Sequence, residues 1–463
     1  MRLLAIAAIA AIAAIAACGA PAVPRAPVAP AAPAASRTVA VPAVPAVSAS
    51  SAPSASSARP APPAPTSAEL ADAATRAALD ALAARDFAAV TRAFAPASAP
   101  TPAQVAAVWA NRAGAMGAVT RWSIADRTRQ DGFETRIVRI ELERGQLQGL
   151  LVITPETDRL ASLFLAKPTP PPRYIVPARF REEPITVGAA PYLLSGTLTL
   201  PAGPGPFPAT VLVHGSGPND RDSTVGSNKI FKDLAQGLAS AGIAVLRYDK
   251  RTFQYGDQLT NAITIDEEVV DDAVAATRAL AARPEIDARR LFVIGHSLGG
   301  LLAPEIAARA GSVAGAVLLA PPGRSPWNIL RAQLRYLHAP RETRASIERA
   351  MIENTFGGTT GMLGMPHAYW TDLESRDGVA EAASLGKPVL VLHGDRDYQV
   401  TAEDRAVWKQ GLARVRNVEF ATLPGDNHLF IRGNNTPGPA EYKLPGHVDD
   451  RVVARTIAFI RRR

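Results

Sequence analysis

The chain has 463 residues, 47% of them hydrophobic, so it is long enough for two or three domains and apolar enough for a large core. Its formal net charge is +8, but basic and acidic residues are interspersed, and the longest basic run is the terminal residues 461–463. Because no basic stripe carries interleaved aromatic side chains, the composition argues against a nucleic-acid-binding function.

The N-terminal segment predicts an export signal. Arg2 precedes an apolar stretch, residues 3–17, that is shorter than the roughly 20 residues needed to span a bilayer. Residues 15–18 read Ile-Ala-Ala-Cys and resemble a bacterial lipobox, and Cys18 is the only cysteine of the chain. An ordinary signal peptide is the alternative. We predict a lipoprotein signal peptide over residues 1–18, lipidation of Cys18 and a cell-envelope location, and Gly19 favours the outer membrane over the inner one.

The next segment changes in composition twice. Residues 19–66 are almost only Ala, Pro, Ser and Val, which predicts a disordered linker. Apolar residues at helical spacing over 67–94 and 101–114 then predict helices, with Ser67 as a candidate N-cap. Alternating segments between residues 119 and 168 predict antiparallel strands. The pattern predicts a small α+β domain over residues 67–167.

A second domain is expected over residues 173–463, after a proline-rich linker. An opening hairpin is followed by six nearly continuous apolar runs, typical of strands buried on both faces. Helical segments separate these runs, so we predict a mostly parallel, doubly wound α/β sheet that is covered on both sides. The runs are residues 208–215, 242–249, 289–296, 314–321, 387–394 and 417–424, and the helical segments are 229–240, 266–283, 298–311, 402–414 and 447–463.

Ser297 lies where the third of these runs ends and a helix begins. Chemistry in such sheets takes place at the carboxyl ends of the strands. A sharp turn at this point would make side chains two positions either side collide, and Gly295 and Gly299 remove them. The sequence is therefore a G-x-S-x-G nucleophile elbow, with Ser297 as the candidate nucleophile. A passive serine in a glycine-rich turn is the alternative.

A serine hydroxyl needs a base, and the base needs a carboxylate. Of seven histidines, His428 follows the last apolar run and is our candidate, with His447 as its rival near the final helix. Asp395 and Asp397 follow the preceding run, and the pattern G-x-x-D selects Asp397, while Asp395 is expected to bind amides of its own turn. The order Ser297, Asp397, His428 is that of α/β-hydrolase triads.

An oxyanion formed at Ser297 needs two N–H donors. Leu298, the residue after the nucleophile, supplies one, and the loop 212–222 is expected to supply the other. Ser216 is the first candidate in that loop and Gly217 the second. The next charged residues, 220–222, read Asp-Arg-Asp and predict a local ion-pair cluster that holds the loop.

The stretches "HGSGPNDRD", "GIAVLRYDKR" and "GHSLGGLLAPEIAARA" together resemble a subfamily of bacterial α/β-hydrolase serine esterases. The resemblance implies an α/β-hydrolase fold preceded by an accessory domain that is similar to cone-shaped, ketosteroid-isomerase-like modules. It implies no cofactor and no metal. Many members have Arg-Gly after the strand-end aspartate, where this chain has Lys250, Arg251 and Thr252.

Residues 322–386 are too long for a plain crossover and predict a cap of two amphipathic helices and a mobile apolar loop. Five cap residues are candidates either for an acyl pocket or for packing of the cap on the core: Trp327, Met362, Met365, Tyr369 and Trp370. We predict a membrane-anchored serine esterase that acts on short to medium acyl esters. The alternatives are a peptidase or acyltransferase with the same triad, and a ligand- or cell-wall-binding lipoprotein that uses the hydrolase half as a scaffold.

Overall fold

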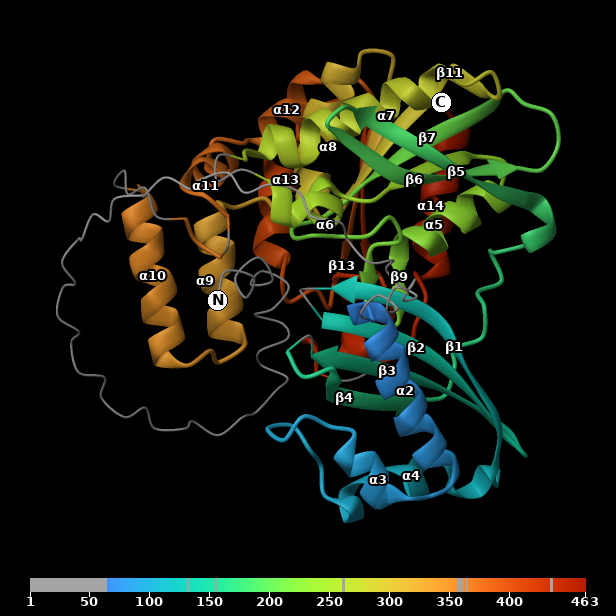
Figure 1. Ribbon diagram of the computed structural model, residues 1–463. Helices are drawn as coiled ribbons and strands as arrows, with labels where there is room; N and C mark the ends of the chain where they lie inside the picture. The colour runs from blue at the N-terminus through green and yellow to red at the C-terminus, as the bar shows by residue number, and fades with distance from the viewer. Residues whose placement is uncertain are drawn as a thin grey trace, which may run out of the picture.

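The structure is a computed structural model, and it describes residues 65–463 except 131–132, 155, 260–262, 356–360, 364 and 434–435. A small α+β domain precedes a larger α/β domain (Figure 1). The predicted signal peptide, Cys18 and the linker up to residue 64 lie outside the described residues. Within the described ranges, no helix is both long enough and apolar enough to cross a membrane.

The small domain packs helices on one face of an antiparallel sheet with the strand order β1-β2-β3-β4. The single helix predicted over 67–94 is interrupted, because Arg85 adopts a positive φ of 57°. The first helix is capped by Thr66 and not by Ser67: Thr66 Oγ1 accepts from the Glu69 amide, and the Glu69 carboxylate accepts from the Thr66 amide. The elements are α2 (Ser67–Ala83), α3 (Phe87–Arg92), α4 (Pro102–Ala113), β1 (Val119–Gln130), β2 (Phe133–Leu142), β3 (Gly145–Thr154) and β4 (Arg159–Ala166).

The larger domain is built on an eight-stranded sheet with the order β14-β13-β12-β11-β7-β10-β6-β5. The six strands from β14 to β10 run parallel, while β6 and β5 form the predicted antiparallel hairpin at the edge. The predicted α/β-hydrolase sheet is therefore confirmed. Its strands are β5 (Phe180–Ala189), β6 (Tyr192–Pro201), β7 (Phe207–Val213), β10 (Ala244–Tyr248), β11 (Ile286–His296), β12 (Gly315–Leu319), β13 (Val389–Gly394) and β14 (Val418–Leu423).

Both faces of the parallel strands are covered, which explains their continuous apolar sequences. In β11, Val293 packs into the core on one side, whereas Phe292 and Ile294 pack into the core on the other. One face is covered by α5 (Ile230–Ser240) and α14 (Asp450–Arg461), and the other by α7 (Asp271–Ala281), α8 (Leu298–Ala310) and α13 (Ala402–Gly411) (Figure 1).

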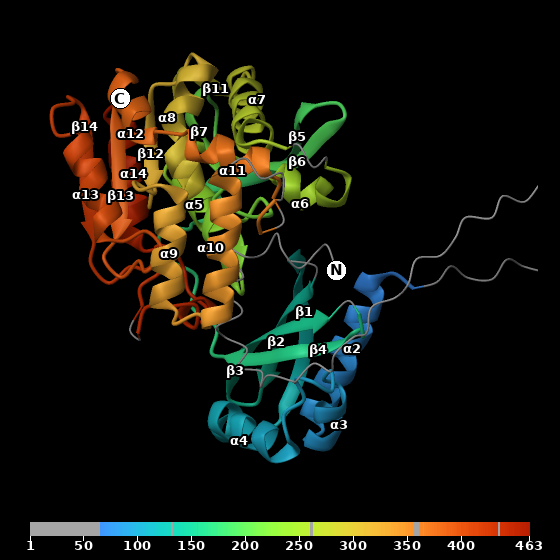
Figure 2. The same cartoon turned by 90° about the vertical axis from the view of Figure 1, so that its left-hand side faces the viewer.

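The cap differs from its prediction. Helices α9 (Pro326–Tyr336) and α10 (Arg341–Thr355) are the two expected ones, and they lie side by side in both views (Figure 2). The predicted loop partly lies outside the described residues, but from His367 it is helical: α11 (His367–Glu374) and α12 (Gly378–Ser384) follow. Helix α11 is short and owes its stability to the burial of Tyr369, Trp370 and Leu373 in the tertiary structure, which the local sequence pattern does not reveal.

Several short elements connect the main helices and strands. The helix predicted over 266–283 begins with a π-helical turn, Asp266–Val270, that runs into α7. Helix α6 (Arg251–Tyr255) follows β10, and a small hairpin joins β8 (Thr224–Val225) to β9 (Asn228–Lys229). Lys229 forms an ion pair with Asp126 of β1, so this hairpin contacts the small domain. Turns of 3₁₀ helix lie at Gly114–Met116, Pro177–Arg179, Gly256–Gln258 and Glu441–Lys443.

Candidate active site

Ser297 occupies a strained turn between β11 and α8. Its backbone has φ 54° and ψ −120°, a conformation that costs an L-residue about 1–3 kcal/mol. The Ser297 amide donates to the Leu319 carbonyl of the neighbouring strand at 2.8 Å, which fixes the turn. Because α8 starts at Leu298, the positive end of the helix lies next to the Ser297 hydroxyl.

The two glycines of the elbow are required by close backbone contacts. A Cβ on Gly295 would lie 1.9 Å from the Gly299 carbonyl oxygen, and a Cβ on Gly299 would lie 2.2 Å from the Val213 carbonyl oxygen. Real Cβ atoms do not approach backbone so closely. The turn is therefore wedged between its own helix and the end of β7.

Gly295→Ala is expected to lower the free energy of unfolding by about 3 kcal/mol, because rigid backbone cannot make room for the methyl group. Gly114→Ala is the matched control, since a Cβ there meets no atom within 4 Å, and its effect should stay within about 0.5 kcal/mol. Thermal unfolding of both variants measures the difference. Equal melting temperatures would contradict this reading of the elbow.

Asp397 and His428 meet in a buried hydrogen bond. The His428 Nδ1 and the Asp397 Oδ2 lie 2.6 Å apart, and both side chains are buried. The other carboxylate oxygen of Asp397 accepts from the amides of Gln399 and Val400 at 2.8 and 2.9 Å. A proton on Nδ1 leaves the His428 Nε2 as an acceptor, which is the tautomer that a general base requires.

The His428 loop lies against the nucleophile turn. The His296 Nε2 contacts the His428 carbonyl oxygen at 2.8 Å, and the two imidazole rings are 4.8 Å apart. His296 directly precedes Ser297, so the loop and the turn are held together. Among the described residues no hydrogen bond joins the Ser297 hydroxyl to the His428 imidazole, and such bonds commonly shorten only when substrate binds.

The remaining predicted polar residues occupy other places. The rival base His447 contacts the Asp233 carboxylate of α5 at 3.1 Å, whereas the imidazole that contacts the Asp397 carboxylate is that of His428. Asp395 accepts from the Gly425 amide at 2.7 Å, so it holds the loop after β14 and not, as predicted, amides of its own turn. The sequence could not reveal this, because the partner lies 30 residues away.

Three buried histidines lie near the ends of the central strands: His214, His296 and His393. Burial removes their hydration and lowers the pKa of His214 and His296 to about 3 and that of His393 to about 4. All three are therefore neutral at physiological pH, and their roles are structural.

Acid is expected to destabilise the protein through these histidines. Each takes up a proton near pH 6.5 in the unfolded chain but only near pH 3 to 4 in the folded one, so its stabilising contribution is complete above pH 6.5 and is lost as the pH falls. At pH 5 each lowers the free energy of unfolding by about 2 kcal/mol relative to pH 7.5. Three carboxyl groups act oppositely, because burial raises the pKa of Asp426 to about 7 and raises the pKa values of Asp220 and Asp272 as well. Asp222 and Asp449 have a lowered pKa and, like the histidines, lose stabilising charge as the pH falls. Calorimetry should show a lower melting temperature at pH 5, and a higher one would refute the assignment.

The candidate oxyanion loop approaches Ser297 closely. A Cβ on Gly215 would lie 3.1 Å from the Ser297 Cβ. The Asn219 side-chain amide donates to the carbonyls of Gly215, Ser216 and Gly217 at 3.3, 3.1 and 2.9 Å. In a trans peptide the N–H points opposite to the carbonyl, so the amides of Ser216 and Gly217 face away from Asn219. The N–H groups of Ser216 and Gly217 therefore both remain candidates for the second oxyanion donor. Asn219, whose side chain holds this loop, was not predicted from the sequence.

The predicted ion-pair cluster within residues 220–222 is wrong. Arg221 pairs with Asp249 at 2.6 Å, and Asp222 pairs with Arg247 of β10 at 2.9 Å. Asp220 accepts from the amide and hydroxyl of Thr224. Arg221 and Asp222 thus pair with side chains 28 and 25 positions along the chain, and not with each other.

A cavity of about 640 Å³, counted with its open mouth, begins at the candidate nucleophile. Ser216, Ser297 and Leu298 line it together, and apolar cap residues close it. Of the five predicted pocket residues Trp370 lines the cavity, whereas the others pack in the core between cap and sheet. The described residues that line the cavity are Ser216, Ser297, Leu298, Leu301, Pro322, Arg324, Pro326, Ile329, Leu330, Gln333, Trp370, Leu373, Gln399 and Val400.

Comparisons with known proteins identify the family to which the chain belongs. Residues 210–435, a range that contains all three candidate catalytic residues, match the model of the alpha/beta hydrolase family. Esterase EstD of Thermotoga maritima is 40% identical over 334 residues, which are 70% of this chain and 79% of that protein. The chain belongs to the α/β hydrolase family.

Two further similar proteins cover less of this hydrolase. The mitochondrial acyl-coenzyme A thioesterase 2 of Homo sapiens is 29% identical over 147 residues, 32% of this chain and 26% of that protein. Among solved structures, the Pyrococcus furiosus esterase Pf2001 is 18% identical with a TM-score of 0.41, covering 61% of the hydrolase and 91% of that chain.

Proposed function

We propose that the protein is a carboxylic ester hydrolase whose catalytic triad is Ser297, His428 and Asp397. The observation that carries the proposal is the buried 2.6 Å bond between His428 and Asp397, beside a serine in a strained strand-to-helix turn. The similarity to an esterase over most of the chain supports ester chemistry.

The residues act in two half-reactions. The Ser297 Oγ attacks the ester carbonyl while the His428 Nε2 takes its proton, and the Asp397 carboxylate stabilises the imidazolium. The amides of Leu298 and Ser216 donate to the oxyanion, and each such donor is worth about 3 kcal/mol in the transition state. His428 then gives its proton to the leaving alcohol. Water, deprotonated by His428, attacks the acyl-enzyme and releases the acid and Ser297.

The cavity supports small to medium acyl groups as substrates. Its walls next to Ser297 are apolar, with Leu298, Ile329, Leu330 and Trp370 around the space that an acyl chain would enter. Helix α9 closes the cavity from the cap side. An acyl chain longer than this space would have to displace the cap.

Acyl chain length is therefore expected to control the rate. With p-nitrophenyl esters, kcat/KM should be greatest for chains of roughly two to eight carbons and fall for longer ones. Leu330→Ala removes a wall of the cavity and should raise the relative kcat/KM for the longer chains about 10-fold, as one or two methylene groups do in apolar pockets. Leu193→Ala, an exposed leucine of the edge hairpin, is the control. An unchanged chain-length profile in Leu330→Ala would place the acyl group elsewhere.

Reaction class is tested with matched substrates that share one acyl group. The p-nitrophenyl ester should be cleaved at least about 100-fold faster than the corresponding anilide or acyl-coenzyme A thioester, with no transfer to added alcohols. A faster anilide would make the protein a peptidase, and acyl transfer as the main outcome would make it an acyltransferase. No turnover of any substrate would favour the binding-protein alternative.

The small domain is proposed to be a cone-like accessory module without chemistry of its own. Its helices pack on one face of the sheet around an apolar core that includes Leu79, Trp109 and Val138. A pocket between α4 and β4 is lined mainly by apolar side chains. A Ser297→Ala protein should have no residual turnover that depends on the small domain. If such turnover remained and substitutions in the small domain abolished it, the small domain would have chemistry of its own.

The location of the enzyme rests on residues 1–18, which predict lipidation of Cys18 and outer-membrane anchoring. The full chain expressed in a Gram-negative host should incorporate radiolabelled palmitate and fractionate with the outer membrane. Cys18→Ser should lose both properties. Palmitate-free wild-type protein in the soluble periplasmic fraction would instead indicate an ordinary signal peptide.

A further inference from the structure

A buried ion pair lies directly behind the candidate oxyanion loop. The Lys250 side chain is 2% exposed, and its Nζ donates to the Gly215 carbonyl at 2.9 Å, the Gly217 carbonyl at 3.1 Å and the Glu268 Oε1 at 2.9 Å. These three bonds use all three donors of the ammonium group. The Lys250 charge is thus held entirely by the loop and by Glu268.

This arrangement is unusual for a purely stabilising contact. Lysine is among the residues least often fully buried, and a buried ion pair is commonly no more stable than apolar side chains of similar volume. Two of its partners are the carbonyls of Gly215 and Gly217, which flank Ser216. Their position indicates that Lys250 acts on the conformation of the loop.

The bond from Lys250 to Gly215 orients the peptide that carries the Ser216 N–H. In that trans peptide the carbonyl and the N–H are antiparallel, so a carbonyl held by Lys250 turns the N–H to the opposite side. A cation on the carbonyl also polarises the peptide and strengthens its N–H as a donor. The Lys250 amide donates to the Asn219 carbonyl at 3.0 Å, which fixes the loop a second time.

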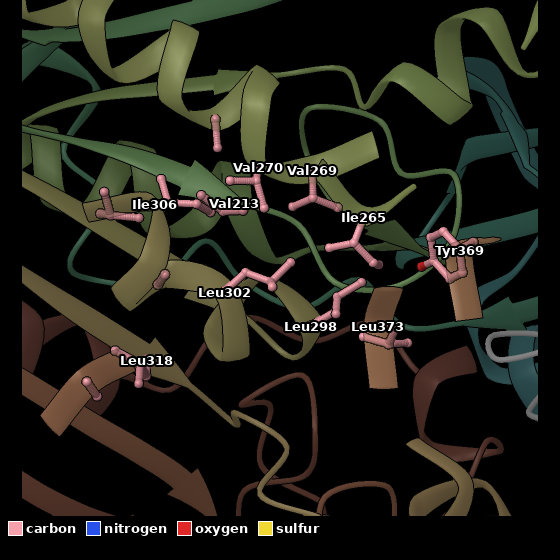
Figure 3. Packing of buried hydrophobic residues seen from close by; sticks show 14 of the residues in the cluster. Val213, Ile265, Val269, Val270, Leu298, Leu302, Ile306, Leu318, Tyr369 and Leu373 are labelled. Atoms are coloured by element: carbon pink, nitrogen blue, oxygen red, sulfur yellow. The ribbon is translucent and has the colours of Figure 1, made fainter. Parts of the chain in front are cut away.

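Glu268 connects this pair to the cap. It belongs to the π-helical turn that precedes α7, its side chain is 1% exposed, and its Oε1 also accepts from the Thr252 hydroxyl at 2.9 Å. Turns of this kind are frequent at functional sites. Tyr369 of α11 lies close by: burial and the negative charge of Glu268 raise the pKa of its hydroxyl well above the usual value. Figure 3 shows Tyr369 and Leu373 of the cap facing Ile265 and Leu298.

We propose that Lys250 is a positioning residue of the oxyanion hole, and that Glu268 supplies the counter-charge that keeps its ammonium group behind the loop. Lys250 holds the Gly215 and Gly217 carbonyls so that the Ser216 N–H faces the reacting carbonyl. The inference rests on the proposed esterase mechanism and adds a residue that touches neither substrate nor nucleophile.

The test uses a double variant, because Lys250→Met alone leaves Glu268 buried without a partner. In the double variant Lys250→Met with Glu268→Gln, kcat for a p-nitrophenyl ester should fall roughly 10- to 100-fold, while KM changes less than about 3-fold. This fall in kcat should not exceed the fall that follows the loss of a direct oxyanion donor. The inhibition constant of a trifluoromethyl ketone, which forms an oxyanion adduct with the serine, should rise by the same factor as kcat/KM falls. A merely structural role would not link these two quantities.

Asn219→Ala tests the same loop without touching the buried pair. Its side-chain amide holds the same carbonyls, so the variant should show the same coupled loss of kcat and ketone affinity at unchanged KM. Lys387→Met is the control, since the Lys387 Nζ also donates to a glycine carbonyl, that of Gly311, on the exposed surface. It should keep wild-type kcat.

A folded double variant with wild-type kcat and ketone affinity would overturn the proposal, and so would a change in KM alone. If the double variant does not fold, Asn219→Ala decides by the same two readouts. Failure of the triad itself is distinguishable, because the wild-type protein would then show turnover that does not depend on Ser297.

Discussion

Ser297→Ala is expected to reduce kcat for p-nitrophenyl ester hydrolysis by roughly 10⁵- to 10⁶-fold, because the variant lacks the hydroxyl that lies where the start of α8 and the His428 loop meet. The strained backbone is the same for alanine as for serine, so the melting temperature should change little. Steady-state kinetics and thermal unfolding of the purified variant measure both effects.

Ser223→Ala is the matched control for this variant. Ser223 also has a positive φ, of 50°, and is buried, but it lies outside the proposed triad. Its kcat should stay within about 2-fold of wild type. Comparable activity of Ser297→Ala and Ser223→Ala would rule out Ser297 as the nucleophile.

Asp397→Asn should lower kcat by about 10³- to 10⁴-fold. The asparagine would still accept from the amides of Gln399 and Val400 through its oxygen, so the turn should persist. Its NH₂ group would then face the His428 Nδ1 as a donor, and this favours the tautomer with the proton on Nε2. The histidine could no longer accept the serine proton.

Asp395→Asn tests whether the effect is specific to one of the two aspartates. Asp395 receives the Gly425 amide at 2.7 Å and has no contact with His428, so kcat should change less than about 3-fold. The reverse result, with Asp395 essential and Asp397 dispensable, would overturn the assignment of the triad acid. Kinetics of the two variants at several pH values supply the comparison.

The parts of the fold that the sequence predicted are those fixed by local or periodic constraints. Strands buried on both faces need continuous apolar runs, as in β11, where Phe292 and Val293 enter opposite cores. The elbow is recognisable because steric exclusion acts between residues four apart, Gly295 and Gly299. Both signals lie within a few residues of the feature they specify.

The parts that the sequence did not predict depend on partners far along the chain. Lys250 looks like a solvated lysine after a strand, and only the fold brings Glu268 and the Gly215 carbonyl to it. The pairing of Asp222 with Arg247 was missed for the same reason. Helix α11 was read as a loop because its stability comes from burial of Trp370 and its neighbours against the core.

The most direct test of the account is covalent labelling of the nucleophile. Purified enzyme is treated with a fluorophosphonate, which reacts with activated serines, and the modified peptide is identified by mass spectrometry. The account predicts one phosphonate per chain on Ser297 and loss of esterase activity in proportion to labelling. The Asp397→Asn variant should be labelled more slowly than the wild-type enzyme. A stoichiometric adduct on another serine, with Ser297 unmodified and activity lost, would contradict it.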